Sequence, residues 1–577
     1  MGTAGVRRDQ LTFGRRAALA TLAALALAGC TTSYLSGPPS VPLAKGATLA
    51  SCVDLAGRIS FPNTAIQSAT IIGTGTLSVA SAPIDEHCRI TGTMFQRVSP
   101  VDGQTYAIGF EMRLPKDWNG RFFHQVNGGT DGNIGTASGG IGGGGPLSNG
   151  LKMGFAVLSS DAGHNNSQNP LFGIDPQARL DYGYQAVGKL TPMAKAIIAT
   201  AYGKGPDTSY LVGCSNGGRH AMVGAARYAD HYEGILAGHP GFNLPKAAVA
   251  QLYGAQQFNP LASNPADLSS SFTVTERRLV ANTVLKQCDG LDGATDGMVQ
   301  DVQACKKHFD LARDVPSCGA AGRDGTCLSA AQKTAIGNIF AGARNRAGKP
   351  LYASFPFDAG ITSANWAGWK FNSSIGNARD PVAVAFIFQT PPAPATIMTD
   401  TKAFALAFDM DNDAPKIDAK DATYTESSLS FMTPPDATRL DALKKRGAKM
   451  IAYHGVSDGV FSSDDTVAWY DGVRAANGAD PSNFVRLFLV PGMNHCAGGP
   501  ATDQFDLMTA LVNWVEKGQA PNAVVASVRG PANAGGANAE VPASWSPNRT
   551  RPLCAYPGVA RYNGSGDLES AANFSCR

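Results

Sequence analysis

A serine flanked by glycines, Ser215 in the stretch GCSNGGRHA (residues 213–221), places the strongest constraint on the fold of this chain. A short β-prone run, residues 210–212, precedes this G-x-S-x-G core, and a segment of helical pattern, RHAMVGAARYA, follows it. Strand, tight turn and helix in this order form a nucleophile elbow, which exposes the serine at a helix N-terminus. Glycines suit that turn because it is strained and neighbouring backbone approaches closely. A glycine-rich loop would also match the motif, but its context favours a catalytic Ser215.

The triad of an α/β hydrolase runs serine, acid, histidine along the chain. Asp458 follows a predicted strand at 450–453, and His495 follows another at 485–490. His495 is the only histidine after Asp458, so the base has no competitor. Asp464 and Asp465 compete with Asp458 as the acid, but they lie deeper in a predicted helix. We therefore expect Ser215 as nucleophile, His495 as base and Asp458 as its orienting acid.

The cysteines predict disulfides near this chemistry. Eleven are present, and no CxxC pair occurs, which argues against a zinc ribbon or a thioredoxin-like site. If Cys30 is lipidated, as its position at the end of the N-terminal segment indicates below, ten cysteines remain. An even number is typical of exported proteins with disulfides. Pairing nearest neighbours would link Cys52–Cys88, Cys288–Cys305, Cys318–Cys327 and Cys554–Cys576.

That pairing leaves Cys214 and Cys496, which directly flank Ser215 and His495. A bond between them would hold their Cα atoms about 5.5–6 Å apart. The bond would hold the two catalytic loops together. This matters because a shift of about 1 Å between catalytic groups can lower the reaction rate on the order of 10²-fold. The alternative is that Cys214 is a small buried residue.

An oxyanion hole needs two backbone donors, and one is the amide of Asn216, directly after the serine. The other should follow an earlier strand, and the predicted strand 121–126 is followed by Asn-Gly-Gly. Gly129 is the first choice and Gly128 the next. The glycine-rich stretch 139–145 follows no strand, and we expect it to be a flexible surface loop.

The N-terminus has the order of a signal peptide. Four arginines precede an apolar run at 17–28, which is too short for a stable bilayer anchor, and LAGC then ends at Cys30. This ending resembles a bacterial lipobox, which implies removal of residues 1–29 and lipidation of Cys30; an ordinary cleavage site nearby is the alternative. The paired arginines also fit the twin-arginine route. We expect export from a bacterial cell, as an outer-membrane lipoprotein or a periplasmic or secreted protein, with membrane contact only through that lipid.

The charge of the chain excludes one class of partner. The formal net charge is +3, and residues 1–29 carry a net +3, so the remainder is neutral. A neutral chain has no electrostatic footprint for nucleic acid. Its 577 residues, 44% hydrophobic and 16% charged, indicate a globular protein of about two to four domains, or one domain with a large insertion.

These residues together resemble the tannase and feruloyl esterase family, which carries a Cys-Ser, Asp, His-Cys arrangement matched here by Cys214-Ser215, Asp458 and His495-Cys496. The resemblance includes NGGTDG, GFAVLSSDAGH, GILAGHPGFN, YHGVSDGVF and PGMNHCAGG, spans about residues 52–576, and extends to the cysteine pairs. It implies an α/β fold, an α/β-hydrolase core with a large inserted lid domain. The implied parts are a signal peptide at 1–29, the first part of the core at 30–242, the lid with a calcium loop at 243–438, and the second part of the core at 439–577.

The stretch CDGLDGATDGMVQD carries three aspartates between glycines. Calcium takes 6–8 oxygen ligands, some from backbone carbonyls, but no glutamate closes an EF-hand here. From the residues alone, an Asp/Gly-rich surface turn is the alternative to a metal site. The resemblance implies a structural calcium ion in the lid and no organic cofactor, with its ligands at Asp289, Asp292 and Asp296 and the carbonyls of Ala294 and Met298.

The resemblance also places His454, Val460 and Phe461 against an aromatic acyl group. The alternative for His454 is a hydrogen-bonding role away from the substrate. Aromatic side chains in the lid could face a substrate ring or form core: Trp366, Trp369, Phe371, Phe386 and Phe388.

The expected function is a serine carboxylic-ester hydrolase that cleaves small aromatic acid esters through an acyl-enzyme on Ser215. Feruloyl or other hydroxycinnamoyl esters, galloyl esters and terephthalate monoesters are in range. One alternative is a non-catalytic surface lipoprotein of the same fold that binds aromatic ligands. A serine peptidase is disfavoured by the Cys-Ser and His-Cys pairs.

Overall fold

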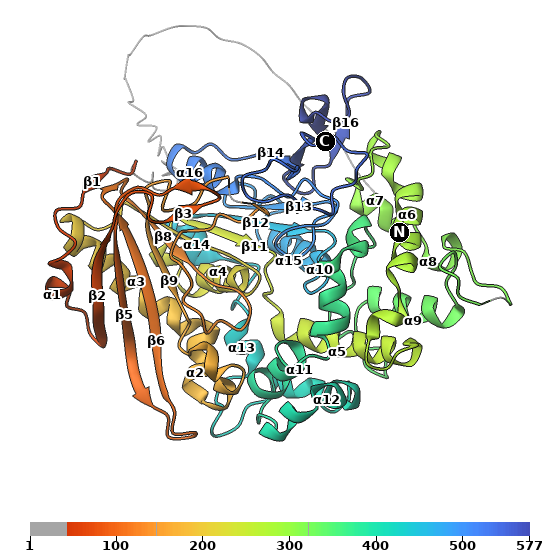
Figure 1. The fold of residues 1–577 in the computed structure, drawn as a ribbon, viewed down its shortest axis with the longest axis horizontal. Coiled ribbons are helices and arrows are strands. Elements are labelled where there is room, and N and C mark those ends of the chain that lie inside the picture. Colours follow the sequence, from red (N-terminus) through yellow and green to blue (C-terminus); the bar gives the residue numbers. More distant parts are fainter. Residues whose placement is uncertain (1–42, 146, 321) are drawn as a thin grey trace, which may run out of the picture. The chain divides into compact units, whose positions relative to one another are not determined.

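The computed structural model describes residues 43–145, 147–320 and 322–577. The predicted signal segment and Cys30 lie outside them. In the described chain a central sheet has nine strands (Figure 1). Across the sheet they are ordered β13 (Val485–Val490), β12 (Lys449–Gly455), β11 (Gly234–Gly238), β10 (Thr208–Cys214), β8 (Arg121–Gln125), β9 (Ala156–Ser160), β6 (Thr105–Pro115), β5 (His87–Val98) and β2 (Thr64–Ile72).

Most of this sheet is parallel. Neighbouring strands from β13 through β9 pair in parallel. Strands β6, β5 and β2 extend one edge as an antiparallel meander. The predicted α/β class is confirmed. The antiparallel edge was not predicted.

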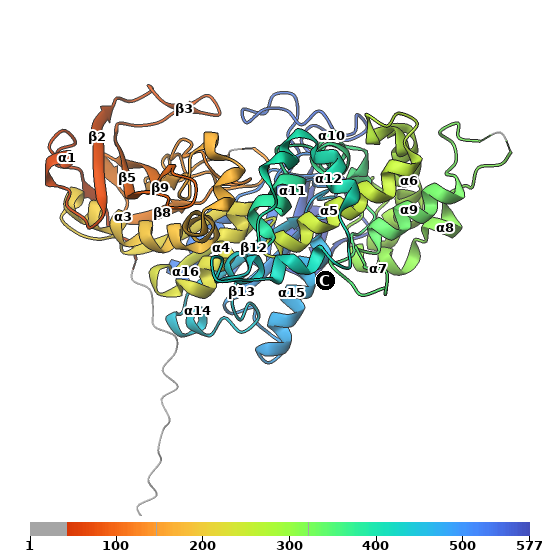
Figure 2. The ribbon, with the colours of Figure 1, turned by 90° about the horizontal axis from the view of Figure 1, so that it is seen from below.

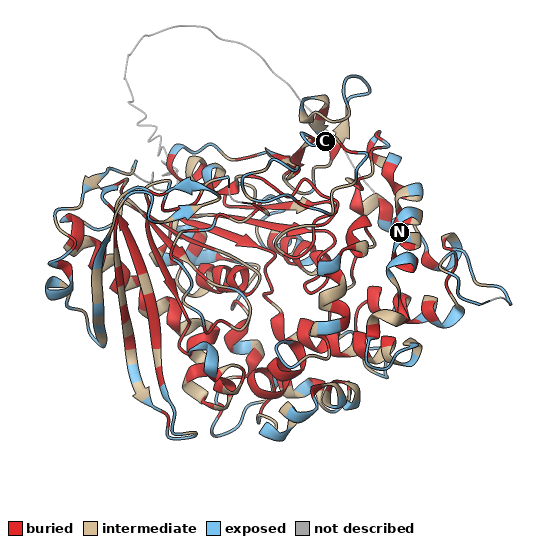
Figure 3. Cartoon of the chain, viewed as in Figure 1, coloured by how far each residue is buried: buried red, intermediate tan, exposed pale blue. Residues whose placement is uncertain are grey.

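Helices cover both faces of the parallel part. Side chains alternate along a strand, so that Tyr210 and Val212 of β10 pack with Leu511 of α16 (Leu507–Lys517), whereas Leu211 packs on the other face with Met222 of α4 (Asn216–Arg227). Figure 3 shows the central strands almost wholly buried. The remaining helices around the sheet are α1 (Leu55–Arg58), α2 (Pro176–Leu180), α3 (Ala186–Tyr202), α14 (Asp441–Arg446) and α15 (Ser463–Ala476).

The chain leaves the sheet between β11 and β12 and forms a mainly helical segment. Its helices are α5 (Leu244–Phe258), α6 (Val274–Cys288), α7 (Val302–His308), α8 (Leu311–Asp314), α9 (Ala330–Phe340), α10 (Ala364–Ala367), α11 (Asp380–Val382), α12 (Thr401–Ala407) and α13 (Ser428–Met432). Figures 1 and 2 show α6, α8 and α9 on the side opposite the antiparallel edge with β2 and β5. Other helices of the same segment, α5, α11 and α13, lie below the sheet in the view of Figure 1.

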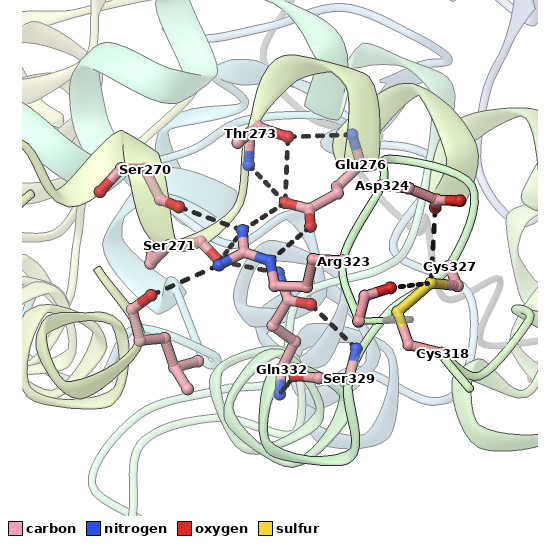
Figure 4. Close-up of polar contacts among 12 residues, drawn as sticks. Ser270, Ser271, Thr273, Glu276, Cys318, Arg323, Asp324, Cys327, Ser329 and Gln332 are labelled. Carbon is pink, nitrogen blue, oxygen red and sulfur yellow. Dashed lines mark hydrogen bonds and ion pairs between the residues drawn. A yellow bond between two sulfur atoms is a disulfide. The ribbon is translucent and has the colours of Figure 1, made fainter. Parts of the chain in front are cut away.

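A polar cluster ties one loop of this segment to α6 (Figure 4). Arg323, in the loop closed by the Cys318–Cys327 disulfide, donates to both carboxylate oxygens of Glu276 at 2.8 Å. Glu276 also completes a capping box with Thr273 at the start of α6. The loop is thus held at the helix N-terminus by its disulfide and by a bidentate ion pair.

Four two-stranded sheets accompany the central one in the described chain. They pair β1 (Ala47–Thr48) with β7 (Asp117–Trp118), β3 (Ser78–Val79) with β4 (Ala82–Pro83), β14 (Ala523–Ser527) with β15 (Thr550–Cys554), and β16 (Ala560–Tyr562) with β17 (Phe574–Cys576).

Five disulfides form among the described residues. They join Cys52–Cys88, Cys214–Cys496, Cys288–Cys305, Cys318–Cys327 and Cys554–Cys576.

The glycine-rich stretch 139–145 is not the surface loop that its composition predicts. Gly139, Ile141, Gly143 and Gly145 are buried. A Cβ atom on Gly143 would lie 2.7 Å from the carbonyl oxygen of Phe505. The glycines therefore allow close packing of this loop against the second half of the chain.

Candidate active site

The predicted site residues gather at the carboxyl ends of neighbouring parallel strands. Ser215 follows β10, Asp458 follows β12 and His495 follows β13. The loop with Gly129 follows β8. After β8 the chain forms β9 on one side and β10 on the other. Such a switch point is where open α/β sheets bind their ligands.

Ser215 lies in a strained turn. Its φ of 67° and ψ of −128° are unusual for a residue with a side chain and cost on the order of 1–3 kcal/mol. Ser215 donates its amide to Gly238 at 3.0 Å and precedes α4 directly. A Cβ atom on Gly213 would lie 2.6 Å from the carbonyl oxygen of Val126. The glycine therefore permits the turn that exposes the serine.

The structure brings Ser215, His495 and Asp458 into one hydrogen-bonded chain. Nε2 of His495 lies 2.8 Å from Oγ of Ser215. Nδ1 of the same ring lies 2.7 Å from Oδ2 of Asp458. An imidazole bonded in this way can take the serine proton while the carboxylate stabilises its cationic form.

Asp458 is fully buried and accepts hydrogen bonds from several directions. Its Oδ1 accepts from the amides of Val460 and Phe461 at 2.8 and 3.0 Å. Nδ1 of His239 lies 2.8 Å from Oδ2. Burial alone would raise the pKa of Asp458, but the charge of His495 and the hydrogen bonds from His239, His454 and His495 hold this pKa well below its usual range. Asp458 is therefore ionised at neutral pH.

His454 does not line the substrate pocket, contrary to the role implied by the resemblance. Its side chain is fully buried, and its ring nitrogens face Thr466 Oγ1 at 2.8 Å and the Phe461 carbonyl at 3.1 Å. Its Nε2 also lies 3.3 Å from Asp458. The structure favours the alternative, a hydrogen-bonding role behind the acid.

His239, His454 and Asp458 form a group that could hold a metal ion, since their ligand atoms lie within 4.8 Å of one another. Each already has a hydrogen-bonding partner in the protein. Burial also lowers the pKa of His239 to about 3, so this ring is neutral. Asp464 lies apart, in an ion pair with Lys306 at 2.6 Å.

The Cys214–Cys496 disulfide joins the two loops that carry Ser215 and His495. The Cα atoms of the cysteines lie 6.2 Å apart and 282 residues apart in sequence. Cys496 has a φ of 61°, and Ser215, next to Cys214, has a φ of 67°. Each of the two loops therefore has a residue in an unusual backbone conformation at the disulfide.

A small pocket opens at Ser215, and Gly129 and Asn216 line it beside the serine. Gly128 is close as well, because a Cβ atom there would lie 3.6 Å from Cβ of Ser215. The pocket also has an apolar wall formed by Leu244, Trp369, Ala383, Phe388, Val460 and Phe461. The predicted Val460 and Phe461 are thus present, and Phe461 packs edge-on against the His495 ring at 5.3 Å.

Trp369 also packs edge-on against that ring, with the centroids 5.2 Å apart. Trp369 and Phe388 belong to the aromatic residues whose position the sequence leaves open. Trp366, Phe371 and Phe386 are core residues instead.

Sequence reasoning missed four further polar residues of this pocket, Thr130, Tyr182, Arg379 and Asp380. Arg379 is exposed, and its guanidinium lies 5.5 Å from the Trp369 ring. Among the described residues no carboxylate forms an ion pair with Arg379. A lone arginine in the stretch GNARDPVAV carries no pattern that would have identified it.

The aspartate-rich loop lies away from this pocket, packed against the C-terminal part of the chain. Asp289 accepts from the amides of Asp296 and Gly297 at 3.0 and 2.8 Å. Asp296 forms an ion pair with the buried Arg551. Asp292 is 2% exposed, and among the described residues its Oδ2 has no hydrogen-bonding partner.

Comparisons with known proteins cover nearly the whole chain. Residues 88–577 match the family described as tannase and feruloyl esterase. A mono(2-hydroxyethyl) terephthalate hydrolase of Piscinibacter sakaiensis is 40% identical, over 93% of this chain and 92% of its own. A probable feruloyl esterase B of Emericella nidulans is 27% identical over 91% and 94%.

Solved structures agree in fold. Feruloyl esterase B from Aspergillus oryzae has a TM-score of 0.71 at 24% identity and covers 91% of this chain and 99% of its own. A tannin acyl hydrolase from Aspergillus niger has a TM-score of 0.64 at 19% identity, over 94% and 96%.

Proposed function

The chain belongs to the tannase and feruloyl esterase family and is a carboxylic ester hydrolase, and we propose that it cleaves esters of small aromatic acids through an acyl-enzyme on Ser215. The observation that carries this proposal is the hydrogen-bonded chain from Ser215 through His495 to Asp458 at the mouth of an aromatic-lined pocket. Membership of this family of ester hydrolases removes the alternative of a non-catalytic protein that only binds aromatic ligands.

In the first half of the reaction, His495 takes the proton of Ser215 as Oγ attacks the ester carbonyl. Backbone amides of Gly129 and Asn216 stabilise the resulting oxyanion. The tetrahedral intermediate then collapses, and His495 gives its proton to the leaving alcohol. Asp458 stays ionised throughout and stabilises the imidazolium.

In the second half, His495 removes a proton from water, which attacks the acyl-enzyme. The aromatic acid leaves, and the proton returns to Ser215. The Cys214–Cys496 disulfide keeps the nucleophile and the base in register through both halves.

The pocket suits an aromatic acyl group that carries an anionic substituent. Trp369, Phe388 and Phe461 offer flat surfaces for a ring. Arg379 has no ion-pair partner among the described carboxylates and can form charge-assisted hydrogen bonds with a free carboxylate. A terephthalate monoester has both features, and the 40% identical relative is named for such a substrate.

A hydrolysis panel tests the proposal with methyl ferulate, methyl gallate and mono(2-hydroxyethyl) terephthalate. We expect the wild type to hydrolyse at least one and Ser215→Ala to hydrolyse none. A folded wild type that is inert on all three would contradict the proposal.

Arg379→Gln tests the anionic preference. We expect KM for the terephthalate monoester to rise about tenfold, which corresponds to ~1.4 kcal/mol. The neutral dimethyl ester is the matched substrate, and its KM should stay within about twofold. Equal changes for both substrates would rule out a carboxylate contact.

The helical segment 243–438 serves as the lid, between the first part of the core at 30–242 and the second part at 439–577. Its position between β11 and β12 supports this division. It also supplies Leu244, Trp369, Arg379 and Phe388 to the pocket.

A structural calcium ion braces the lid at Asp289, Asp292 and Asp296, with the carbonyls of Ala294 and Met298. The unpartnered, buried Oδ2 of Asp292 fits a cation here. Burial, with the charges of Asp296 and Asp289, also raises the pKa of Asp292 to about 7, as expected for a carboxylate that lacks a counter-ion. The ion would hold the loop and take no part in ester cleavage.

Chelation tests this site. We expect EGTA to lower Tm by several degrees and CaCl₂, but not MgCl₂, to restore it. Asp292→Asn should abolish the response, whereas Asp409→Asn, in another aspartate-rich turn, should keep it. If EGTA leaves the Tm of the wild type unchanged, the calcium assignment is wrong.

We also propose export, with Cys30 as a lipid anchor. The five disulfides among the described residues fit an oxidising compartment. In the described chain no helix is both long and apolar enough to span a bilayer. Labelled palmitate should enter the wild-type protein but not Cys30→Ala. Equal labelling of both proteins would exclude this anchor.

A further inference from the structure

The two amides proposed for the oxyanion hole come from separate parts of the chain. Gly129 lies in the loop after β8, and Asn216 is the first residue of α4. An oxyanion hole acts only if both donors are held about 2.7–3.1 Å from the same developing charge. Some contact must therefore fix the loop against the helix.

Asp131 makes such a contact. Its carboxylate Oδ2 accepts from Nδ2 of Asn216 at 2.9 Å and lies 2.8 Å from Nε2 of His220. Both partners belong to α4, and the side chains of Asp131 and His220 are nearly fully buried. One oxygen of the loop thus lies within hydrogen-bonding distance of two side chains of the helix that begins at the oxyanion site.

The backbone transmits this contact to Gly129. The amide of Asp131 donates to the carbonyl of Gly128 at 3.2 Å, which closes a tight turn around Gly129. Asp131 has a φ of 54°, an uncommon conformation for a residue with a side chain. Displacing the Asp131 side chain would therefore displace the turn that carries the Gly129 amide.

The helix end of the contact is equally fixed. Oδ1 of Asn216 accepts from Nε and Nη2 of Arg219 at 2.8 and 2.7 Å. Burial raises the pKa of Asp131 well above its usual range, and the charge of Arg219 opposes that shift. The two bonds from Arg219 to Asn216 therefore hold the helix side of the contact in place.

We propose that Asp131 is a positioning residue for ester hydrolysis, which holds the Gly129 amide and the Asn216 amide at a fixed separation through its hydrogen bonds to Asn216 and His220. This inference rests on the proposed function, because the two amides act only in that reaction. According to this inference, Asp131 lowers the energy of the transition state, and so raises kcat, but has little effect on substrate binding.

The test uses Asp131→Ala, which removes both hydrogen bonds, and Asp131→Asn, which retains one acceptor oxygen. p-Nitrophenyl butyrate serves as substrate, so the natural acyl group need not be known. A fluorophosphonate probe, allowed to react to completion, counts the active sites in each preparation. For Asp131→Ala we expect kcat per labelled site to fall about 10²-fold, with KM within about threefold. Asp131→Asn should lie between this variant and the wild type.

The rate of fluorophosphonate labelling provides a second readout. Phosphonylation of Ser215 also builds negative charge next to the two amides. Its rate constant should therefore fall in parallel with kcat, whereas a residue that only stabilises the fold would leave the rate per folded site unchanged.

Glu516→Gln is the matched control. Glu516 is a buried carboxylate at the opposite end of the same strands, where it accepts from Arg121 at 2.7 Å and Tyr210 at 2.8 Å. We expect this variant to lower Tm but to keep kcat per labelled site. An equal loss of kcat in Glu516→Gln would overturn the inference, since any buried carboxylate would then have the same effect.

Two further outcomes separate the inference from the function it rests on. If the wild type is active and both Asp131 variants lose only Tm, Asp131 has no positioning role and the proposed function stands. If the wild type neither hydrolyses the ester nor reacts with the probe, the proposed function fails, and the role of Asp131 fails with it. If Asp131→Ala does not fold, Asp131→Asn decides by the same measurements.

Discussion

At the scale of single residues, Asp458 is the most heavily bonded group of the site. Two backbone amides and the rings of His239 and His495 lie within 3.0 Å of its carboxylate. This arrangement keeps it ionised in a fully buried position, where a carboxylate without such partners would take up a proton.

Asp458→Asn should therefore reduce kcat about 10⁴-fold with little change in KM, because the amide favours the wrong tautomer of His495. Asp464→Asn is the control, since Asp464 is the next acid along the chain and pairs with Lys306 instead. Steady-state kinetics with p-nitrophenyl butyrate measure both variants. A larger loss in Asp464→Asn would reverse the assignment of the acid.

The sequence predicts Ser215, Asp458 and His495 as a group because each follows a β-prone run and their order is restricted. It cannot predict that His454 lies behind Asp458, since burial of that ring depends on Thr466 and on the turn at Phe461. Arg379 has no sequence signal for the same reason: only tertiary packing brings it to Ser215.

At the scale of elements, the helical segment 243–438 carries a buried lysine next to its pocket-lining residue Trp369. Lys370 is 3% exposed in the π-helix Gly368–Ser373, and its Nζ lies 3.8 Å from the centroid of the Phe355 ring. Burial lowers the pKa of Lys370 to about 7, although Asp458 and Asp380 oppose the shift.

Between pH 7 and its ordinary pKa near 10.5, the unfolded chain holds a proton on Lys370 that the folded chain does not hold. The stability of the wild type therefore rises with pH across this window, by at most about 1.4 kcal/mol per pH unit from this group. Lys370→Met removes the burial penalty, so its Tm should exceed that of the wild type at pH 7 and lose this advantage toward pH 10.

Differential scanning fluorimetry at several pH values measures the effect. Lys420→Met, at an exposed position, should show no such trend relative to the wild type. An advantage of Lys370→Met that is constant from pH 7 to pH 10 would show that Lys370 is charged in the folded protein.

Sequence patterns find the strands that carry the site, because β10, β12 and β13 are short apolar runs bounded by glycines and loops. They do not find how the glycine-rich stretch 139–145 packs. A Cβ atom on Gly145 would lie 2.5 Å from Cδ of Arg529, a partner nearly four hundred residues away. Contacts of this range leave no local periodicity.

At the scale of the whole molecule, the Cys214–Cys496 disulfide closes a loop across 282 residues. In the chain-entropy view such a loop stabilises the folded state by up to about 5 kcal/mol. The Cys318–Cys327 disulfide has a sequence separation of 9 and lies in the helical segment 243–438.

Replacing Cys214 and Cys496 together by serine should lower both Tm and kcat per labelled site. The matched replacement of Cys318 and Cys327 should change kcat less than twofold. Thermal unfolding and p-nitrophenyl butyrate kinetics compare the two pairs. Full kcat without the Cys214–Cys496 bond would show that packing alone aligns Ser215 and His495.

The helical segment between β11 and β12 also has a consequence for synthesis of the protein on the ribosome. Ser215 is polymerised 280 residues before His495, a delay of roughly 15 to 55 s at ribosomal speeds of about 5–20 residues per second. Throughout that interval the growing polypeptide holds a hydroxyl without its base. The nascent chain is thus unable to attack cellular esters until its last quarter has been made.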